Sequence, residues 1–433
     1  MIGTQSPHDF PYDPGGPRAL AVAIVGSGPA GCYTAQFLAK SLPGAEITVF
    51  EALPAPYGLV RYGVAADHQG AKGVARQFDR LFTGDGVRFA GNVAVGRDVE
   101  FARIAANFDV VVLATGLPGD RQLEVPRDPR ARVVGAGALL RALNGFPRDL
   151  APPCAPLGSE VAVVGMGNVA VDVLRLLAKD DTALTGSDID DEALRQVRPA
   201  PPKTIVVLAR SGVSQAKCDP AMLRELVSLP GIDLAVSGMD ERDEGPVADV
   251  LRPFATAPPS GRGRTRITFH FGLEPERIAS REGRAVLAAR RRDSAREEFE
   301  ADTVVTAIGF TRGDAEDETV PQDDWAGSHV YRVGWLSRGA QGTIARNRKD
   351  AQQVARRIAE DCAAGRLRPE KDGFRALTEL IDHRMVDFRA WQRIEAAEHR
   401  SAAPGRCRRK ITDLGRMLAV ATGLDDRERK ESA

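Results

Sequence analysis

The stretch Ala19-Leu20-Ala21-Val22-Ala23-Ile24-Val25-Gly26-Ser27-Gly28-Pro29-Ala30-Gly31 decides the fold of this 433-residue chain. Its first part is a short apolar run that ends at a glycine, which is typical of a buried parallel strand. Residues 31–40 then predict a helix, and residues 45–50 predict a second strand. A strand, a helix and a strand in this order form a βαβ unit.

The glycines Gly26, Gly28 and Gly31 have the spacing G-x-G-x-x-G, directly after the first strand and at the start of the helix. The first glycine of this motif permits a tight turn, the second lets the backbone approach a pyrophosphate, and the third lets helix and strand pack closely. Glu51 ends the second strand about twenty residues later, where a carboxylate accepts hydrogen bonds from ribose hydroxyls. A lone glycine motif also occurs in ordinary turns, but the strand, helix and acid together predict a dinucleotide site.

A second unit of the same kind begins at residue 161. Residues 161–164 predict a strand, residues 169–178 a helix and residues 204–208 another strand. Between the first two lies Gly165-Met166-Gly167-Asn168-Val169-Ala170, which is the accepted variant G-x-G-x-x-A. The polar segment 179–202 is expected to be a surface excursion.

The residues after the last strand distinguish the second site from the first. This strand ends in Ala209-Arg210-Ser211-Gly212, without an acid. A cation at Arg210 suits the 2′-phosphate of NADP, which an acid would repel, although a surface arginine beside a loop is the alternative. The acid-ended site therefore suits FAD, and the Arg-ended site suits NADPH.

Two such units predict an α/β fold with two Rossmann-like three-layer dinucleotide-binding domains. Near the C-terminus, residues 303–309 predict a further strand and residues 343–364 a helix. We expect a split FAD-binding domain, residues 18–118 and 300–433, interrupted by an NAD(P)-binding domain of residues 119–299. Residues 1–17 are expected to form a disordered lead.

Composition argues against several other classes of protein. Lys+Arg and Asp+Glu are both 59, so the net charge does not favour nucleic acid. No apolar run is long enough to span a bilayer, and the N-terminus resembles neither a secretory signal nor a transit peptide, so we expect a cytoplasmic protein without membrane insertion. The five cysteines are scattered without a C-x-x-C pair, so no metal site, redox dithiol or iron–sulfur cluster is predicted.

Taken together, further motifs show that the chain resembles the adrenodoxin reductase family, which includes bacterial ferredoxin–NADP reductases of the same type. The likeness runs from about residue 21 to about residue 418, and Gly58-Leu59-Val60-Arg61 is its most diagnostic part. The matching stretches are Val25 to Gly31 with Tyr33-Thr34-Ala35, Pro56 to Ala65 with Asp67-His68, Gly91-Asn92-Val93, Val95 to Val99, Gly167 to Val173, Gly334-Trp335, Arg338-Gly339, Gly342-Thr343-Ile344 and Asn347.

The resemblance implies contacts with both cofactors. For FAD it implies contacts at Ala30, Glu51, Leu59, Val95, Trp335, Gly342, Thr343 and Ile344, beside the glycine motif itself. For NADP it implies contacts at Gly167, Asn168, Val169, Ala170, Arg210 and Gly342, and Ser211 beside Arg210 is counted with this site. Without the resemblance, Trp335 is a core aromatic and Gly342 a simple helix start. A helix that opens there also offers N–H groups to negative charge on a reduced flavin.

The chain departs from the family at the adenosine phosphate. The second of two consecutive arginines is Ser211 here, and a glutamate of the family aligns with Met222. Losing one guanidinium removes a charge-assisted contact of roughly 1.5–3 kcal/mol. We therefore expect a weaker preference for NADPH and some use of NADH, with Lys217 as a partial substitute.

The resemblance also points to three titratable residues as catalytic candidates. His68 lies near the flavin and carrier face in the family, where it relays protons or tunes the flavin; a structural, hydrogen-bonded histidine is the equal alternative. Asp172 and Glu225 match acids on the nicotinamide side, and their alternative is helix-surface charge.

The predicted function is transfer of electrons from NADPH, or NADH, through FAD to a ferredoxin-type iron–sulfur protein that binds transiently to a monomer or weak dimer. Arginines 252, 262, 264 and 266, or the run 290–292, are candidates to steer an acidic carrier, unless they are solvated surface charge. The alternatives are a flavin-dependent monooxygenase, another NAD(P)H-dependent FAD oxidoreductase acting on a small molecule, and a non-catalytic flavin-bound scaffold. Disulfide reductases and glutamate-synthase-like modules need cysteine sets that this chain lacks.

Overall fold

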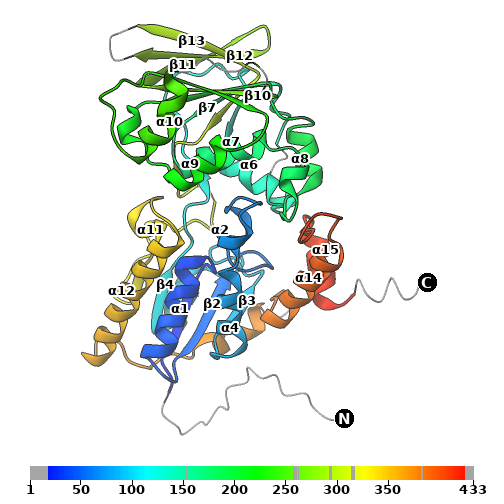
Figure 1. Ribbon diagram of the computed structural model, residues 1–433. Coiled ribbons are helices and arrows are strands. Elements are labelled where there is room, and N and C mark those ends of the chain that lie inside the picture. Colours follow the sequence, from blue (N-terminus) through cyan, green and yellow to red (C-terminus); the bar gives the residue numbers. More distant parts are fainter. Residues whose placement is uncertain are drawn as a thin grey trace, which may run out of the picture.

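The computed structural model describes residues 18–151, 154–256, 261, 263–291, 295–313, 317–381 and 384–424. It contains two large parallel sheets, one in each half of the molecule in Figure 1. The predicted lead, residues 1–17, lies outside the described residues. Within the described ranges, no helix has the length and apolarity needed to cross a membrane.

The first sheet has the strand order β16-β4-β1-β2-β3, and all neighbouring strands are parallel. Every residue of β1 is buried, as the apolar run predicted. Its edge strand β16 comes from far along the chain, so this half of the molecule is assembled from two separate segments. The bounds are β1 Ala21–Val25, β2 Glu46–Glu51, β3 Arg88–Gly91, β4 Val110–Leu113 and β16 Val330–Arg332.

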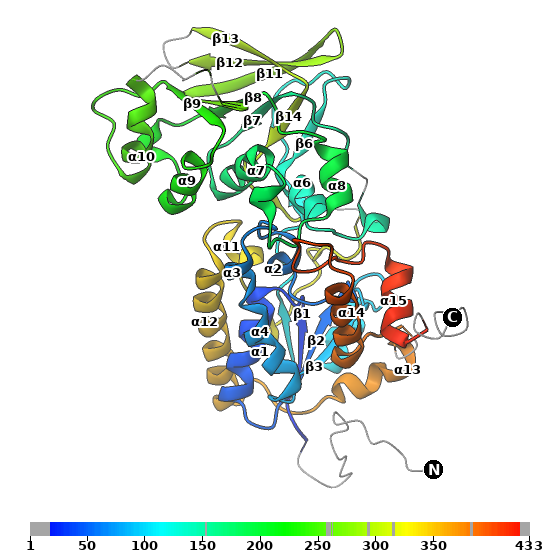
Figure 2. The same cartoon turned by 45° about the vertical axis from the view of Figure 1, so that its right-hand side comes forward.

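Helices from both segments cover this sheet. Helices α1 and α12 lie side by side and share one hydrophobic core with α14 and α15 on the same face of the sheet, whereas α5 and α13 pack on the other face (Figures 1 and 2). Trp391 of α14 is buried with Tyr57 against it edge-on, their ring centroids 6.4 Å apart. The helix bounds are α1 Pro29–Ser41, α2 Leu59–Tyr62, α3 Gln69–Lys72, α4 Ala75–Thr83, α5 Phe101–Asn107, α11 Trp335–Arg338, α12 Ile344–Ala363, α13 Thr378–Ile381, α14 Phe388–Arg400 and α15 Leu414–Thr422.

The second sheet has the order β6-β14-β7-β8-β10-β9 and is also parallel throughout. Helices pack on one face, and a three-stranded antiparallel sheet covers the other, which gives three layers. The helices are α6 Ala136–Leu143, α7 Asn168–Ala178, α8 Asp191–Val197, α9 Pro220–Val227 and α10 Pro246–Thr256. The strands are β6 Val133–Gly135, β7 Glu160–Val164, β8 Thr204–Ala209, β9 Ile232–Ser237, β10 Thr265–Phe271 and β14 Thr303–Thr306, with β11 Leu273–Arg281, β12 Arg284–Arg291 and β13 Arg296–Ala301 in the antiparallel layer.

The predicted α/β fold with two Rossmann-like sheets is confirmed, but two local predictions are wrong. Strand β14 was expected in the first domain, yet it pairs with β6 and β7 of the second sheet, because its apolar residues fill the gap between those strands. The segment 179–202 is not a surface excursion. Its Leu184, Ile189 and Leu194 are buried in the core of the second half, and Asp188 is only 4% exposed.

The chain passes between the halves through a short ribbon. Strand β5, Gly119–Asp120, pairs antiparallel with β15, Phe310–Thr311. The Asp120 carboxylate accepts hydrogen bonds from the backbone N–H groups of Gly137 and Ala138, at 2.7 and 2.9 Å. The ribbon is thereby fixed to the start of α6.

Candidate functional site

The first glycine turn has the geometry that its motif predicts. Gly26 has φ +105°, and a Cβ there would lie 2.6 Å from the Ala114 carbonyl oxygen. A Cβ on Gly31 would lie 2.0 Å from the Gly26 carbonyl oxygen, so strand and helix touch at this point. A Cβ on Gly28 would meet nothing within 4 Å. The turn is therefore closed toward the protein and open at Gly28, the position that faces a pyrophosphate in such motifs.

Glu51 ends β2 beside this turn. Its Oε2 accepts hydrogen bonds from the backbone N–H of Ser27 at 3.1 Å and from the Ser27 hydroxyl at 2.5 Å. Its Oε1 accepts one from the Leu53 N–H at 3.2 Å. Burial raises the pKa of this carboxyl above its usual range, while these hydrogen bonds oppose the rise. The carboxylate is thus held in one orientation at the end of the strand, where a ribose would lie.

A cavity of about 640 Å³ opens at this edge of the first sheet, within the range of about 300–1,000 Å³ seen for cofactor pockets. Residues of the second half, such as Ala138 and Val197, close its far side. Trp335 lies in its wall, stacked on Phe310 with ring centroids 5.4 Å apart. The predicted FAD contacts that line the cavity are Gly26, Gly28, Ala30, Glu51, Leu59, Val95 and Trp335.

The residues present fit FAD. The buried indole Nε1 of Trp335 finds no hydrogen-bond partner among the described residues, and neither does the Thr115 hydroxyl. Both residues line the cavity, whose wall also has the open backbone at Gly28. A long molecule with a pyrophosphate at its centre and polar ring systems at its two ends satisfies these groups.

Four predicted contacts lie outside this lining. Gly31 is buried where α1 meets β1, so it serves helix–strand packing. Gly342 and Thr343 are exposed, and Ile344 begins α12 and packs against the first core. Gly342 has φ +81°, which favours glycine at this sharp entry to the helix. Asn347, about one turn later, does line the cavity, and its Oδ1 accepts a hydrogen bond from Arg338 at 2.9 Å. Contact at 342–344 therefore remains a prediction.

The second glycine turn repeats the geometry of the first. Gly165 has φ +123°, and a Cβ there would lie 2.3 Å from the Ala307 carbonyl oxygen, whereas a Cβ on Gly167 would meet nothing within 4 Å. Ala170 is fully buried, as its packing position in the motif requires. The N–H of Asp219 donates to Asn168 Oδ1 at 2.6 Å, which ties α9 to the start of α7.

The end of β8 carries the predicted phosphate-binding group. Arg210 is exposed, and so is Lys217. Among the residues that the structure describes, neither side chain forms an ion pair or hydrogen bond. Ser211 is half-buried, and its carbonyl accepts a hydrogen bond from the N–H of Gly272. Two unpaired cations therefore lie near the second turn.

The three catalytic candidates are brought together by the fold. His68 Nε2 lies 3.2 Å from Glu225 Oε2, and His68 Nδ1 lies 3.5 Å from Asp172 Oδ1. His68 belongs to the first half of the molecule, whereas the acids come from α7 and α9 of the second. None of the three lines the 640 Å³ cavity. They join the two halves beside it.

Sequence reasoning missed the centre of this cluster. Arg175 is fully buried, and its guanidinium contacts Asp67 at 2.7 Å, Asp172 at 2.8 Å and Glu225 at 2.5 Å. Lys179 adds contacts to Asp67 at 2.6 Å and to Glu225 at 2.9 Å. The signal was present in part, because residues 172 and 175 lie three apart on one face of α7 and Lys179 follows directly at its C-terminal end.

The charges of this cluster shift the pKa values of its three acids. Burial alone would raise the pKa of Asp67, but Arg175 and Lys179 lower it below its usual range. The pKa of Glu225 is likewise lowered, since Lys179, Arg175 and His68 outweigh its partial burial. Burial raises the pKa of Asp172 in spite of Arg175.

Comparison with known proteins agrees with this geometry. Residues 20–207 match the family described as pyridine nucleotide-disulphide oxidoreductase. Cindoxin reductase of Citrobacter braakii is 41% identical, over 95% of this chain and 94% of that relative. NADPH-ferredoxin reductase FprA of Mycobacterium tuberculosis is 31% identical, over 94% of this chain and 100% of the relative. The solved structure of that FprA in complex with NADPH has a TM-score of 0.83 and 29% identity, again over 94% of this chain and 100% of its own.

The fold and the two glycine turns thus define a flavoprotein oxidoreductase that binds FAD and NADP(H). Within that class, the chain belongs to the adrenodoxin reductase-type family of ferredoxin–NADP reductases. The predicted family is confirmed.

Proposed function

We propose that this chain oxidises NADPH and passes the electrons by way of FAD to a ferredoxin-type iron–sulfur protein. One observation carries the proposal. A cavity fitted to FAD opens at the glycine turn of the first sheet, and residues of the second, nicotinamide-binding half close it. Relatives over nearly the full length bear the names ferredoxin reductase and cindoxin reductase.

In this proposal the first half holds FAD. The open backbone at Gly28 and the N–H groups at the start of α1 bind the pyrophosphate, and Glu51 binds the adenosine ribose. Leu59, Val95 and Trp335 enclose the remainder. When bound, FAD supplies the capacity to take up a hydride equivalent and to give up electrons one at a time. The protein supplies orientation and excludes water.

The second half holds NADPH. Gly167 and the first turn of α7 receive its pyrophosphate, with Arg210 and Lys217 at the 2′-phosphate. Because Ser211 stands where the family has a second arginine, NADH is expected to bind as well, though more weakly. We assign the FAD-binding domain to residues 18–118 and to the chain after β14, with the nicotinamide-binding domain between them.

His68 is proposed as a positioning residue that exchanges a proton with solvent. Its two ring nitrogens face Asp172 and Glu225, and its side chain is 25% exposed. Replacement by glutamine is expected to change the pH profile of flavin reduction, whereas a purely structural histidine would lower stability alone. We also expect a cytoplasmic protein that acts as a monomer or weak dimer, with a transient carrier complex.

Anaerobic stopped-flow reduction tests the proposal. The flavin band is expected to bleach with NADPH faster than with NADH, and reduced enzyme is expected to pass electrons to a [2Fe–2S] ferredoxin, read by coupled reduction of cytochrome c. If neither nucleotide bleaches the flavin, the second site does not work as proposed. Rapid NADPH consumption that depends on an organic substrate and O₂ would instead support a monooxygenase.

A further inference from the structure

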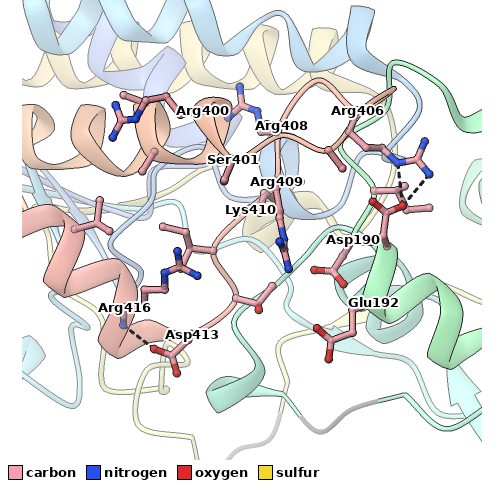
Figure 3. A pocket seen from close by; sticks show the side chains of 18 of the residues that line it. Asp190, Glu192, Arg400, Ser401, Arg406, Arg408, Arg409, Lys410, Asp413 and Arg416 are labelled. Carbon is pink, nitrogen blue, oxygen red and sulfur yellow. Dashed lines mark hydrogen bonds and ion pairs between the residues drawn. The ribbon is translucent and has the colours of Figure 1, made fainter. Parts of the chain in front are cut away.

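A second cavity, of about 730 Å³, lies between α8, α14 and α15, on the side of the molecule shown at the right of Figure 2. Nine arginines and one lysine line it, against four acids, although the whole chain carries no net charge. Figure 3 shows Arg400, Arg408 and Arg409 on one side of this cavity, and on the other Glu192 of α8 and Asp190, which directly precedes that helix. We call it the arginine cavity.

Part of this positive charge is already paired. Arg148 contacts Glu192 at 2.8 Å, and Arg406 contacts Asp191 at 2.8 Å. Arg408 contacts Glu395 at 3.2 Å, and Lys410 is buried against Asp188 at 2.9 Å. Both acids of α8 are thus ion-paired, and these ion pairs hold the walls of the cavity together.

The remaining arginines are exposed and have no carboxylate within ion-pair distance among the described residues. They come from three separate helices and from the segment 401–413. The tertiary fold brings them together, and no continuous basic run in the sequence predicts this cluster. They are Arg195, Arg389, Arg393, Arg400, Arg409 and Arg416, of which Arg393 donates a hydrogen bond to the Ala421 carbonyl. Their guanidinium groups lie on long, solvated side chains around an open cavity, an arrangement that attracts an acidic protein surface without enclosing a small ion.

The basic segments that the sequence suggested as docking sites differ in this respect. Arg290 contacts Glu276 at 2.9 Å, and Arg291 pairs with Glu297. Arg264 contacts Asp180 at 3.5 Å, and Arg252 donates to the Asp243 carbonyl. Arg262 and Arg292 lie outside the described residues. Arg266 is exposed, and its side chain has no ion pair or hydrogen bond among the described residues, so four of these seven arginines have partners within the chain.

The arginine cavity also adjoins the cavity fitted to FAD. Arg148 and Thr412 line both. A protein seated over the arginines therefore sits at the rim of the flavin cavity. The geometry points to the arginine cavity as the docking surface for the acidic electron-carrier protein, an inference that rests on the proposed function.

Charge reversal tests the inference. The docking variant combines Arg400→Glu, Arg409→Glu and Arg416→Glu, none of which breaks an ion pair within the described residues. The control variant combines Lys40→Glu, Arg103→Glu and Arg356→Glu, which lie on α1, α5 and α12 outside both cavities and change the net charge equally. Two acceptors are compared with NADPH as donor: an acidic [2Fe–2S] ferredoxin and the uncharged quinone menadione.

The docking variant is expected to lose about tenfold or more in kcat/KM for the ferredoxin at low salt, with a smaller difference at high salt. The control variant is expected to stay within about twofold of wild type, as are both variants with menadione. Equal ferredoxin rates in the docking and control variants would overturn the inference, and so would a parallel fall in the menadione rate. A wild-type enzyme that reduces menadione but no ferredoxin would refute the proposed function itself, a distinct result.

Discussion

Replacing Arg175 by methionine tests whether the buried charge cluster holds the two halves together. The guanidinium is fully buried between Asp67, Asp172 and Glu225. Removing one partner of a buried ion pair costs about 3–5 kcal/mol, because the charges left behind are neither hydrated nor compensated. Lys179 still reaches Asp67 and Glu225, so Asp172 alone loses its strongest cationic partner, and the lower end, about 3 kcal/mol, is expected.

Urea unfolding followed by far-ultraviolet circular dichroism measures the effect on the flavin-loaded enzyme. The matched control is Arg281→Met. Arg281 also bridges two carboxylates, Glu298 and Glu300, but its side chain is 58% exposed, so solvent screens the interaction and little stability should be lost. Equal losses in the two variants would refute the reasoning, because burial would then not determine the cost.

Three further outcomes are expected. Gly28→Ala should keep the fold but weaken FAD binding, measured by flavin release, whereas Gly31→Ala should lower the thermal midpoint as well, because its Cβ meets the backbone. Burial alone would raise the pKa of Asp188, but Lys410 and Lys72 lower it to about 2. The ionised Asp188 therefore stabilises the folded protein above about pH 4, and this contribution is lost as the pH falls toward 2. Differential scanning calorimetry should find a smaller acid-induced loss of stability in Asp188→Asn than in the wild type. Arg210→Ala should raise KM for NADPH about tenfold and leave KM for NADH nearly unchanged in steady-state assays.

The sequence could predict whatever depends on neighbouring residues. Both glycine turns and their flanking strands and helices follow from short-range spacing. In both turns the first glycine packs against backbone, and the second has free space beside it, as the motif predicts. The sheet that receives an isolated apolar strand does not follow in this way. Strand β14 is apolar and ends at a glycine, which suits either sheet, and only long-range pairing decides between them.

Charged residues were harder to place for a related reason. Asp188 lies in a polar, acidic segment, which indicates solvent exposure, yet Lys72 and Lys410 from distant parts of the chain make its burial possible. The arginine cavity likewise joins residues from 148 to 420. A charge pattern read along the chain reports local composition, whereas the partner that neutralises a charge is set by the tertiary fold.

The assembly of the first sheet from two distant segments has a consequence during synthesis. The second sheet is complete once residue 306 has left the ribosome, whereas the first sheet waits for β16 at residues 330–332 and for α12, which packs on α1. Trp335, part of the flavin cavity, also appears only then. During synthesis, strands β1 to β4 therefore lack their edge strand β16 while the inserted domain folds. FAD binding is accordingly expected only after the C-terminal segment has been synthesised and has folded onto the first sheet.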